Sequence, residues 1–303
     1  MSTPQTPAGA DPLVSTVRHD IYPAISPEHA LKDAAKGLSV LVTGSGRGIG
    51  EAEALAFAQA GAKKVVLTSR SKTQLGEVKE KLLKANPESE VLTIEADATD
   101  EASVDKLFEE AGEVDVLVCN AGYLEPIIPI RDSTPSEWRR SLDVNLFGTY
   151  LATRAFLRAA HARGAIDSGK KLSILLTSSV GSAWTIPGMS GYQSFKSAIN
   201  RFAEFVHFEE PGVRVFAFHP ANTVTKLTVD SIPTDYHGML DDTPELPGGF
   251  AVWLATQDKA DFLRGRYISA NWDVDEVLAK KNEIVEKNLL WTRVVGQEQV
   301  MPK

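Results

Sequence analysis

Tyr192 and Lys196 are the residues whose types and spacing most directly suggest chemistry. They stand four positions apart in a stretch with helical character, residues 192–208, so the phenol and the ammonium share one face. A free tyrosine has a pKa of about 10, and lowering it to about 7 requires roughly 4 kcal/mol. A lysine charge about 4 Å away, at an effective dielectric constant of about 20, supplies about that much. The pair therefore predicts a tyrosine that exchanges protons near neutral pH, although the same spacing also occurs by chance on exposed helices.

A cluster of glycines lies between the first predicted strand, residues 38–43, and the first predicted helix, residues 51–60. Such a turn needs glycine because the backbone takes positive φ, approaches a pyrophosphate closely and packs tightly on the strand. The helix N-terminus adds unpaired N–H groups and a partial positive charge. No G-K-[ST] follows, so a nucleoside triphosphate loop is excluded and a dinucleotide is favoured over a plain glycine-rich loop. The predicted phosphate-binding residues are Gly44, Ser45, Gly46, Arg47, Gly48, Ile49 and Gly50.

The end of the second predicted strand, residues 65–68, indicates which dinucleotide binds. An NAD site normally has an acidic residue here, which binds the adenosine ribose hydroxyl. This chain has Ser69, Arg70 and Ser71 instead. Arg70 offers a planar, permanently charged group suited to a 2′-phosphate, and Arg47 of the glycine turn can converge on it. Either arginine alone is equally consistent with a solvated surface charge, but together they predict NADP(H).

Short apolar strands alternate with helices along most of the chain. Strands are predicted at residues 38–43, 65–68, 91–95, 114–119, 172–176, 213–218 and 266–270, and helices at 51–60, 72–85, 101–110, 138–161 and 192–208. Parallel strands need a crossover that returns over the sheet, and such crossovers are usually helices. The pattern predicts an α/β fold of the Rossmann type, a doubly wound, mainly parallel seven-stranded sheet with helices on both faces.

One domain is expected over residues 38–271, because neither an internal repeat nor a second core is visible. Residues 1–37 contain five prolines and are expected to form an N-terminal arm, disordered over about the first 15 residues. The segment at about residues 226–249 is expected to cover the substrate. Residues 272–303 are expected to form a C-terminal helical tail.

Six motifs in the same order along the chain resemble those of the classical short-chain dehydrogenases/reductases. Residues 43–50 resemble T-G-x-x-x-G-x-G, residues 120–122 N-A-G, residues 192–196 Y-x-x-x-K and residues 220–225 P-G-x-x-x-T. The resemblance covers roughly residues 38–270. The last strand and the start of the tail also resemble fungal members of the family.

The resemblance implies roles for four residues. Tyr192 would be the general acid and base, and Lys196 would hold the ribose hydroxyls and lower the tyrosine pKa. Ser179, which precedes Tyr192 by 13 residues, would hydrogen-bond the substrate oxygen. Asn145 would hold a water beside the lysine through a distortion of its helix, whereas an isolated buried asparagine is more often structural.

The resemblance also implies where the rest of the cofactor lies. The acid after the third strand would meet the adenine, the N-A-G motif would border the ribose, and residues 220–225 would flank the nicotinamide. Ala221 stands where the family usually has glycine, a departure that can tighten or shift the backbone. The residues implied are Asp97, Ala98, Asn120, Ala121, Gly122, Pro220, Thr223 and Thr225.

Composition excludes several other classes of function. The formal net charge of the 303 residues is -8, so the average surface repels a nucleic acid. One cysteine excludes an intramolecular disulfide, and the six histidines have no paired metal-ligand spacing, so no metal is expected. No apolar run approaches the roughly 20 residues of a membrane span, and no secretory signal is present, so a cytoplasmic location is expected. By resemblance, a homodimer or homotetramer is expected.

The sequence therefore favours an NADP(H)-dependent oxidoreductase that interconverts a carbonyl and an alcohol on a small, lipophilic substrate resembling a secondary metabolite. A second hypothesis keeps the same site but not net redox chemistry, as in epimerases, dehydratases or cyclases of this fold. A third, less favoured hypothesis is a cofactor-binding sensor or structural protein. Intact Asn145, Ser179, Tyr192 and Lys196 argue against the third.

Overall fold

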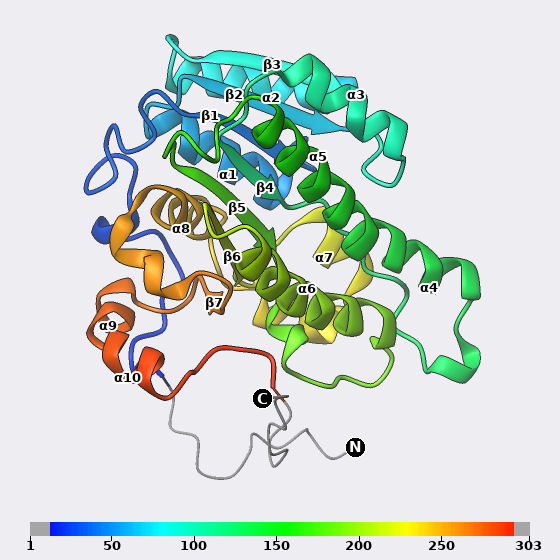
Figure 1. Cartoon of the computed structure of the whole chain (residues 1–303). Coiled ribbons are helices and arrows are strands. Elements are labelled where there is room, and N and C mark those ends of the chain that lie inside the picture. The colour runs from blue at the N-terminus through cyan, green and yellow to red at the C-terminus, as the bar shows by residue number, and fades with distance from the viewer. Residues whose placement is uncertain (1–12, 294–303) are drawn as a thin grey trace, which may run out of the picture.

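The computed structural model describes residues 13–293, and at its centre is a seven-stranded sheet in which every strand is parallel to its neighbours. The strands are β1 (Ser39–Thr43), β2 (Lys64–Ser69), β3 (Glu90–Glu95), β4 (Val116–Cys119), β5 (Leu172–Thr177), β6 (Val213–His219) and β7 (Tyr267–Ser269). Their order is β3-β2-β1-β4-β5-β6-β7, so the winding reverses between β1 and β4 (Figure 1). The predicted doubly wound Rossmann-type fold is confirmed.

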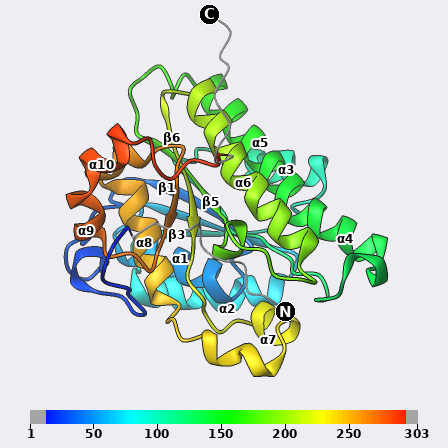
Figure 2. The ribbon, with the colours of Figure 1, turned by 90° about the horizontal axis from the view of Figure 1, so that it is seen from below.

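Helices cover both faces of this sheet (Figure 2). One layer contains α1 (Gly48–Gln59), α2 (Lys72–Ala85) and α8 (Glu245–Thr256), and the other contains α3 (Glu101–Ala111), α5 (Gly148–Ala162) and α6 (Ser190–Glu209). Every residue of β1, β4 and β5 is buried, because both faces of these strands are covered. This explains why the strands appear in the sequence as continuous apolar runs.

The sequence pattern did not predict α8. Most of this helix is buried, including Leu246 and Trp253, and it packs on α1 so closely that a Cβ on Gly248 would lie 2.8 Å from the Ala52 carbonyl oxygen. A helix that is apolar all round lacks the polar face that gives a period of 3.6 residues. The loop predicted over about residues 226–249 consequently differs from the structure, since it begins with α7 (Lys226–Ser231) and ends inside α8.

The long helix predicted at residues 138–161 consists of three segments. They are α4 (Pro135–Leu142), a π-helical segment (Asp143–Phe147) and α5. An inserted π turn widens the helix locally, and such turns are frequent at functional sites. The distortion expected around Asn145 is therefore present in the backbone.

The N-terminal arm and the C-terminal tail pack against each other (Figure 1). Arg18 pairs with Asp273 at 2.7 Å, and Val17 forms a β-bridge with Trp272, just before α9 (Val274–Ala279) and α10 (Lys281–Glu286). Ile25 of the arm is fully buried in the same core as α8. The disorder expected for the first residues falls almost entirely on residues 1–12, and the end of the expected tail on residues 294–303, both outside the described residues.

Glu53 on α1 places a carboxyl group in the apolar core. It is fully buried, and neither oxygen has a hydrogen-bond partner within residues 13–293. Burial raises the pKa of this carboxyl well above its ordinary value of 4.5. A carboxyl with a raised pKa stabilises the fold fully only below about pH 4.5. That contribution is lost as the pH rises toward the pKa of the folded state.

We expect Glu53→Met to raise the thermal midpoint at pH 8 by several degrees, about 1–3 kcal/mol, because it removes an unpaired polar group and keeps the volume. The gain should shrink as the pH falls toward 4.5. Thermal unfolding followed by circular dichroism between pH 4.5 and 8 measures it. Glu109→Met, on the exposed face of α3, is the control and should change little. A thermal midpoint that falls in Glu53→Met at pH 8 would contradict the argument.

Candidate active site

A cavity of about 660 Å³ opens at the carboxyl ends of the strands, beside the point where the winding reverses. Thr43 ends β1 there, Asn120 follows β4, Thr177 ends β5 and Pro220 follows β6. Ligands of open α/β sheets bind at this position, because the loops that leave successive strands diverge there. Of the predicted site residues, the cavity is lined by Gly44, Gly46, Arg47, Gly48, Ile49, Ser69, Arg70, Ser71, Asp97, Ala98, Asn120, Ala121, Gly122, Tyr192, Lys196, Pro220 and Thr225.

Five predicted residues lie outside the lining. They are Ser45, Gly50, Asn145, Ser179 and Thr223. The Ser45 hydroxyl accepts a hydrogen bond from the Thr68 amide at 2.9 Å, and so ties the glycine turn to β2. A Cβ on Gly50 would lie 2.7 Å from the Gly44 carbonyl oxygen, so this glycine permits the turn to close. Buried Thr223 supports the start of α7, where its carbonyl accepts a hydrogen bond from a threonine hydroxyl at 3.1 Å.

The glycine turn has the shape of a phosphate cradle. Gly44 and Gly48 have φ values of 65° and 62°, which disfavour any residue with a Cβ. A Cβ on Gly46 would lie 2.9 Å from the Ser69 hydroxyl, so the floor of the turn must stay free of side chains. The turn leads directly into α1, whose first amides are unpaired within the helix. These residues fit a dinucleotide pyrophosphate.

The far end of the cavity combines two cations and one anion. Arg47 and Arg70 are exposed and both line it. Asp97 accepts hydrogen bonds from the Thr99 amide at 2.9 Å and from the Thr99 hydroxyl at 2.7 Å. Burial acts to raise the pKa of Asp97, but these hydrogen bonds and the nearby Arg70 outweigh it and hold the pKa below its ordinary value. The Asp97 carboxylate is therefore available to accept a hydrogen bond from a bound base.

Tyr192, Lys196 and Ser179 meet at the other end. The Lys196 ammonium lies 5.5 Å from the centre of the Tyr192 ring and donates to the Thr177 carbonyl at 2.7 Å. Burial lowers the pKa of Lys196 to about 8. Burial also raises the pKa of Tyr192, which a hydrogen bond with Ser179 partly offsets. The protein's own groups thus do not produce the lowered tyrosine pKa expected from Lys196, because desolvation of the phenol is the larger effect.

Asn145 is fully buried inside the π-helical segment. Its side-chain amide donates to the Tyr123 carbonyl at 2.6 Å and to the Ser141 carbonyl at 2.9 Å. Gly122 separates it from the lysine, since a Cβ there would lie 3.4 Å from the Asn145 amide oxygen and 4.0 Å from the Lys196 nitrogen. The structure therefore brings Asn145 next to Lys196, although Asn145 does not line the cavity.

Glu125 is a buried carboxylate that the sequence analysis did not single out. One of its oxygens accepts the Tyr192 backbone amide at 2.8 Å. This amide lies in the first turn of α6, whose N-cap residue Met189 makes no side-chain cap. A carboxylate from another segment thus caps the helix that carries Tyr192. No local sequence pattern indicates such a contact, because the two residues are 67 positions apart.

Ala221 takes the left-handed conformation that its position requires, with φ of 82°. This conformation costs a residue with a Cβ roughly 1–2 kcal/mol. The alanine that stands where the family usually has glycine therefore holds backbone strain in this turn. The segment that follows still contacts the glycine turn, because the Thr225 methyl group lies 3.3 Å from the position of a Cβ on Gly48.

None of the helices within residues 13–293 is long and apolar enough to cross a membrane.

Comparison with known proteins places the chain among related sequences. The sequence pattern of the short chain dehydrogenases matches residues 39–235. The short chain dehydrogenase citE of Monascus ruber is 38% identical over 300 residues, which are 95% of this chain and 98% of that protein. The short chain dehydrogenase andI of Emericella variicolor is 32% identical over 92% of this chain and 94% of its own.

A solved structure shows the same architecture. The 3-ketoacyl-(acyl-carrier-protein) reductase from Brucella melitensis, complexed with NADH, superposes with a TM-score of 0.70 at 28% identity. The match covers 78% of this chain and 97% of that one. The matched family pattern, the fungal relatives and the shared fold agree with the motifs around the cavity. The chain therefore belongs to the classical short-chain dehydrogenase/reductase family of nicotinamide-dependent oxidoreductases.

Proposed function

We propose that this protein is an NADP(H)-dependent oxidoreductase that interconverts a carbonyl and an alcohol on a small, lipophilic substrate. The observation that carries the proposal is the position of Tyr192 and Lys196 in the same cavity as the glycine cradle. An acid–base group at one end and a phosphate site at the other are what a hydride-transfer enzyme needs. The fungal relatives named short chain dehydrogenases support the reaction class.

Four side chains of the site have different roles in the proposed reaction. Ser179 and Tyr192 hold the carbonyl oxygen, and Tyr192 gives its proton to the oxygen as negative charge develops there. Lys196, anchored on the Thr177 carbonyl, holds the ribose hydroxyls and adds positive potential beside the phenol. Asn145 positions a water that returns a proton through Lys196. Bound NADPH supplies the hydride.

The cofactor preference follows from the two arginines at the far end of the cavity. Arg47 and Arg70 present permanently charged groups where an NAD site would have a carboxylate. Their guanidinium groups would bind the 2′-phosphate, Asp97 would meet the adenine, and the residues that follow β4 would border the ribose.

Several side chains in the segments expected to border the substrate are apolar. Trp184 and Ile186, between Ser179 and Tyr192, are 51% and 42% exposed, and Leu227 of α7 lines the cavity. Exposed aromatic and aliphatic side chains in the segment between two proposed catalytic residues favour a lipophilic substrate resembling a secondary metabolite. A panel of ketones, aldehydes and alcohols, assayed at 340 nm with each of NADPH, NADP⁺, NADH and NAD⁺, tests the proposal. Stoichiometric absorbance change supports it, and product formation without that change would establish a non-redox reaction.

We also propose assembly into a homodimer or homotetramer through α5 and α6. Phe147 ends the π-helical segment just before α5 and Tyr150 lies in the first turn of α5, and both are exposed, as are Phe205 and Phe208 on α6. Four exposed aromatic side chains on neighbouring helical segments are typical of a surface that another chain covers. Sedimentation of the wild type and of Phe205→Glu distinguishes the assembled from the monomeric state.

The carboxylate of Glu125 gives this mechanism a testable pH dependence. Glu125 raises the pKa of Tyr192 in addition to the effect of burial, since negative charge near the phenol disfavours the phenolate. Lys196 on α6 lies 5.5 Å from the centre of the Tyr192 ring, and Glu137 and Arg140 on α4 are engaged with Tyr123. Neutralising Glu125 therefore lowers the tyrosine pKa.

We expect Glu125→Gln to move the alkaline-rising limb of alcohol oxidation to lower pH, because the negative charge that disfavours the phenolate is removed. The pH profile of kcat with NADP⁺ measures the shift. Glu137→Gln removes a charge from the same small hollow without contacting Tyr192, and it should leave the limb in place. An unchanged profile in Glu125→Gln would show that its carboxylate has no effect on the phenol.

A further inference from the structure

The strained turn at Ala221 lies at the edge of the cofactor cavity. Ala221 is buried and has φ of 82°, and its neighbour Pro220 lines the cavity. Four to six residues further on, Thr225, Lys226 and Leu227 line it again. Strained backbone persists only where surrounding contacts hold it, so the contacts of this turn are informative.

Asp242 supplies the main contact. One carboxylate oxygen accepts the Asn222 amide at 2.6 Å, directly after the strained residue. Asp242 also forms a parallel β-bridge with Thr223, and its side chain is only 1% exposed. A charge-assisted hydrogen bond out of contact with water is stronger than one between neutral groups at a surface.

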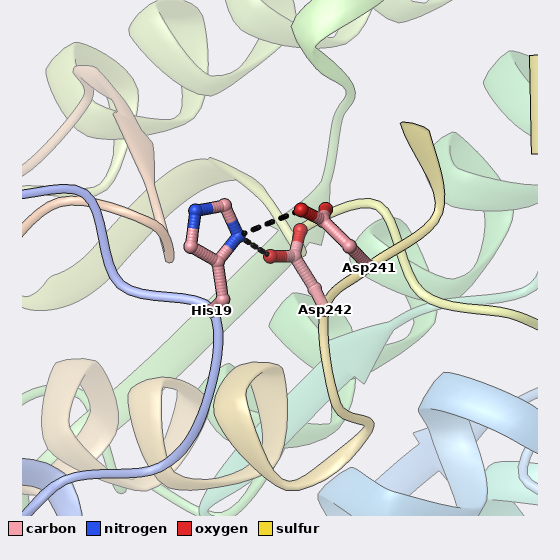
Figure 3. Close-up of side chains that lie close together, drawn as sticks. All are labelled: His19, Asp241 and Asp242. Carbon is pink, nitrogen blue, oxygen red and sulfur yellow. Dashed lines mark hydrogen bonds and ion pairs between the residues drawn. The ribbon is translucent and has the colours of Figure 1, made fainter. Parts of the chain in front are cut away.

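His19 of the N-terminal arm holds the other oxygen of Asp242 (Figure 3). Its Nδ1 lies 2.7 Å from that oxygen and 3.5 Å from the exposed Asp241 carboxylate. The backbone reinforces the contact, since the His19 carbonyl accepts the Thr243 amide at 2.9 Å. The arm is in turn fixed to the C-terminal part of the chain by the ion pair between Arg18 and Asp273.

His19, Asp241 and Asp242 could be taken for the ligands of a metal ion, because one ligand atom from each lies within 4.8 Å of the others. However, the Asp242 oxygens and the His19 nitrogen already bind each other and the Asn222 amide. These hydrogen bonds hold the turn in place, and we call His19 and Asp242 together the His19–Asp242 clamp.

We propose that Asp242, held by His19, is a positioning residue that keeps the strained turn at Ala221 in place and thereby shapes the nicotinamide end of the cofactor cavity. This inference rests on the proposed NADP(H)-dependent function. The segment that the clamp fixes lies against the glycine turn, with the Thr225 methyl 3.3 Å from the position of a Cβ on Gly48. Release of the turn therefore moves one wall of the cavity relative to the phosphate cradle.

The strain itself provides the decisive test, because glycine takes positive φ without cost. We expect Asp242→Ala to raise the Kd for NADPH about tenfold and to speed hydrogen exchange of the peptide that contains residues 220–228. His19→Ala should do the same to a smaller extent, about two- to fivefold. The double variant Ala221→Gly/Asp242→Ala should regain most of the NADPH affinity and most of the protection from exchange that Asp242→Ala loses. Ala221→Gly alone should bind NADPH like the wild type.

Asp241→Ala is the matched control, since it removes a neighbouring carboxylate that does not touch the turn; it should match the wild type in both measurements. Fluorescence titration with NADPH gives the Kd, and hydrogen exchange of the protein alone reports on the turn without the cofactor. Unchanged exchange and binding in Asp242→Ala, or losses that Ala221→Gly does not relieve, would overturn the proposal. A wild-type protein that binds no nicotinamide dinucleotide would instead refute the proposed function. Hydrogen exchange of the protein alone would still show whether the His19–Asp242 clamp holds the turn.

Discussion

Replacing Tyr192 by phenylalanine should lower kcat by about 10²–10⁴-fold while the Kd for NADPH stays within about twofold of the wild type. The change keeps the ring, its burial and its contact with the Lys196 ammonium, and removes only the hydroxyl that Ser179 hydrogen-bonds. A positioned proton donor contributes about this factor to a carbonyl reduction. Steady-state rates with NADPH and a reactive ketone, together with a fluorescence titration of NADPH, separate the two effects.

Tyr123 provides the matched control for this experiment. Its ring also lines the cavity, but its hydroxyl donates to Glu137. Tyr123→Phe should therefore retain turnover within a few-fold. Near-wild-type turnover in Tyr192→Phe would reject Tyr192 as the acid, and an equal loss in both variants would indicate that the hydroxyls act through packing.

The sheet could be predicted from the sequence because its strands are buried on both faces. Apolar runs such as Val116–Cys119 alternate with amphipathic helices, and this alternation depends only on local residue types. The glycine turn could be predicted for the same reason, since the positive φ values of Gly44 and Gly48 are a local requirement. In contrast, α8 has no polar face, so its periodicity carried no signal.

The contacts around the site could not be predicted, because they join segments far apart in the chain. The carboxylate of Glu125 caps a helix 67 positions away, and His19 holds an aspartate 223 positions away. The direction of the Tyr192 pKa shift also depended on tertiary structure. Spacing placed a cation near the phenol, but burial by the surrounding elements raises the pKa of Tyr192.

The two arginines at the adenosine end should account for the choice of cofactor. Arg70→Ala should raise the Kd for NADPH by about 10–100-fold and leave the Kd for NADH nearly unchanged, since one charge-assisted hydrogen bond contributes about 1.5–3 kcal/mol. Arg47→Ala should have a similar but smaller effect, and the double variant should bind the two dinucleotides about equally. Fluorescence titrations with both cofactors measure each value.

Salt provides an independent check on the same argument. The interaction of exposed guanidinium groups with a phosphate is screened at high ionic strength, so wild-type affinity for NADPH should fall between 0.05 and about 0.5 M salt, and affinity for NADH should fall less. Lys72→Ala removes a neighbouring exposed cation whose partner is Glu95, and it should preserve the preference for NADPH. Equal losses of NADPH and NADH affinity in Arg70→Ala would mean that the guanidinium supports the fold of the site and does not recognise the 2′-phosphate. In that case the preference would have to come from Arg47, and Arg47→Ala by itself would abolish it.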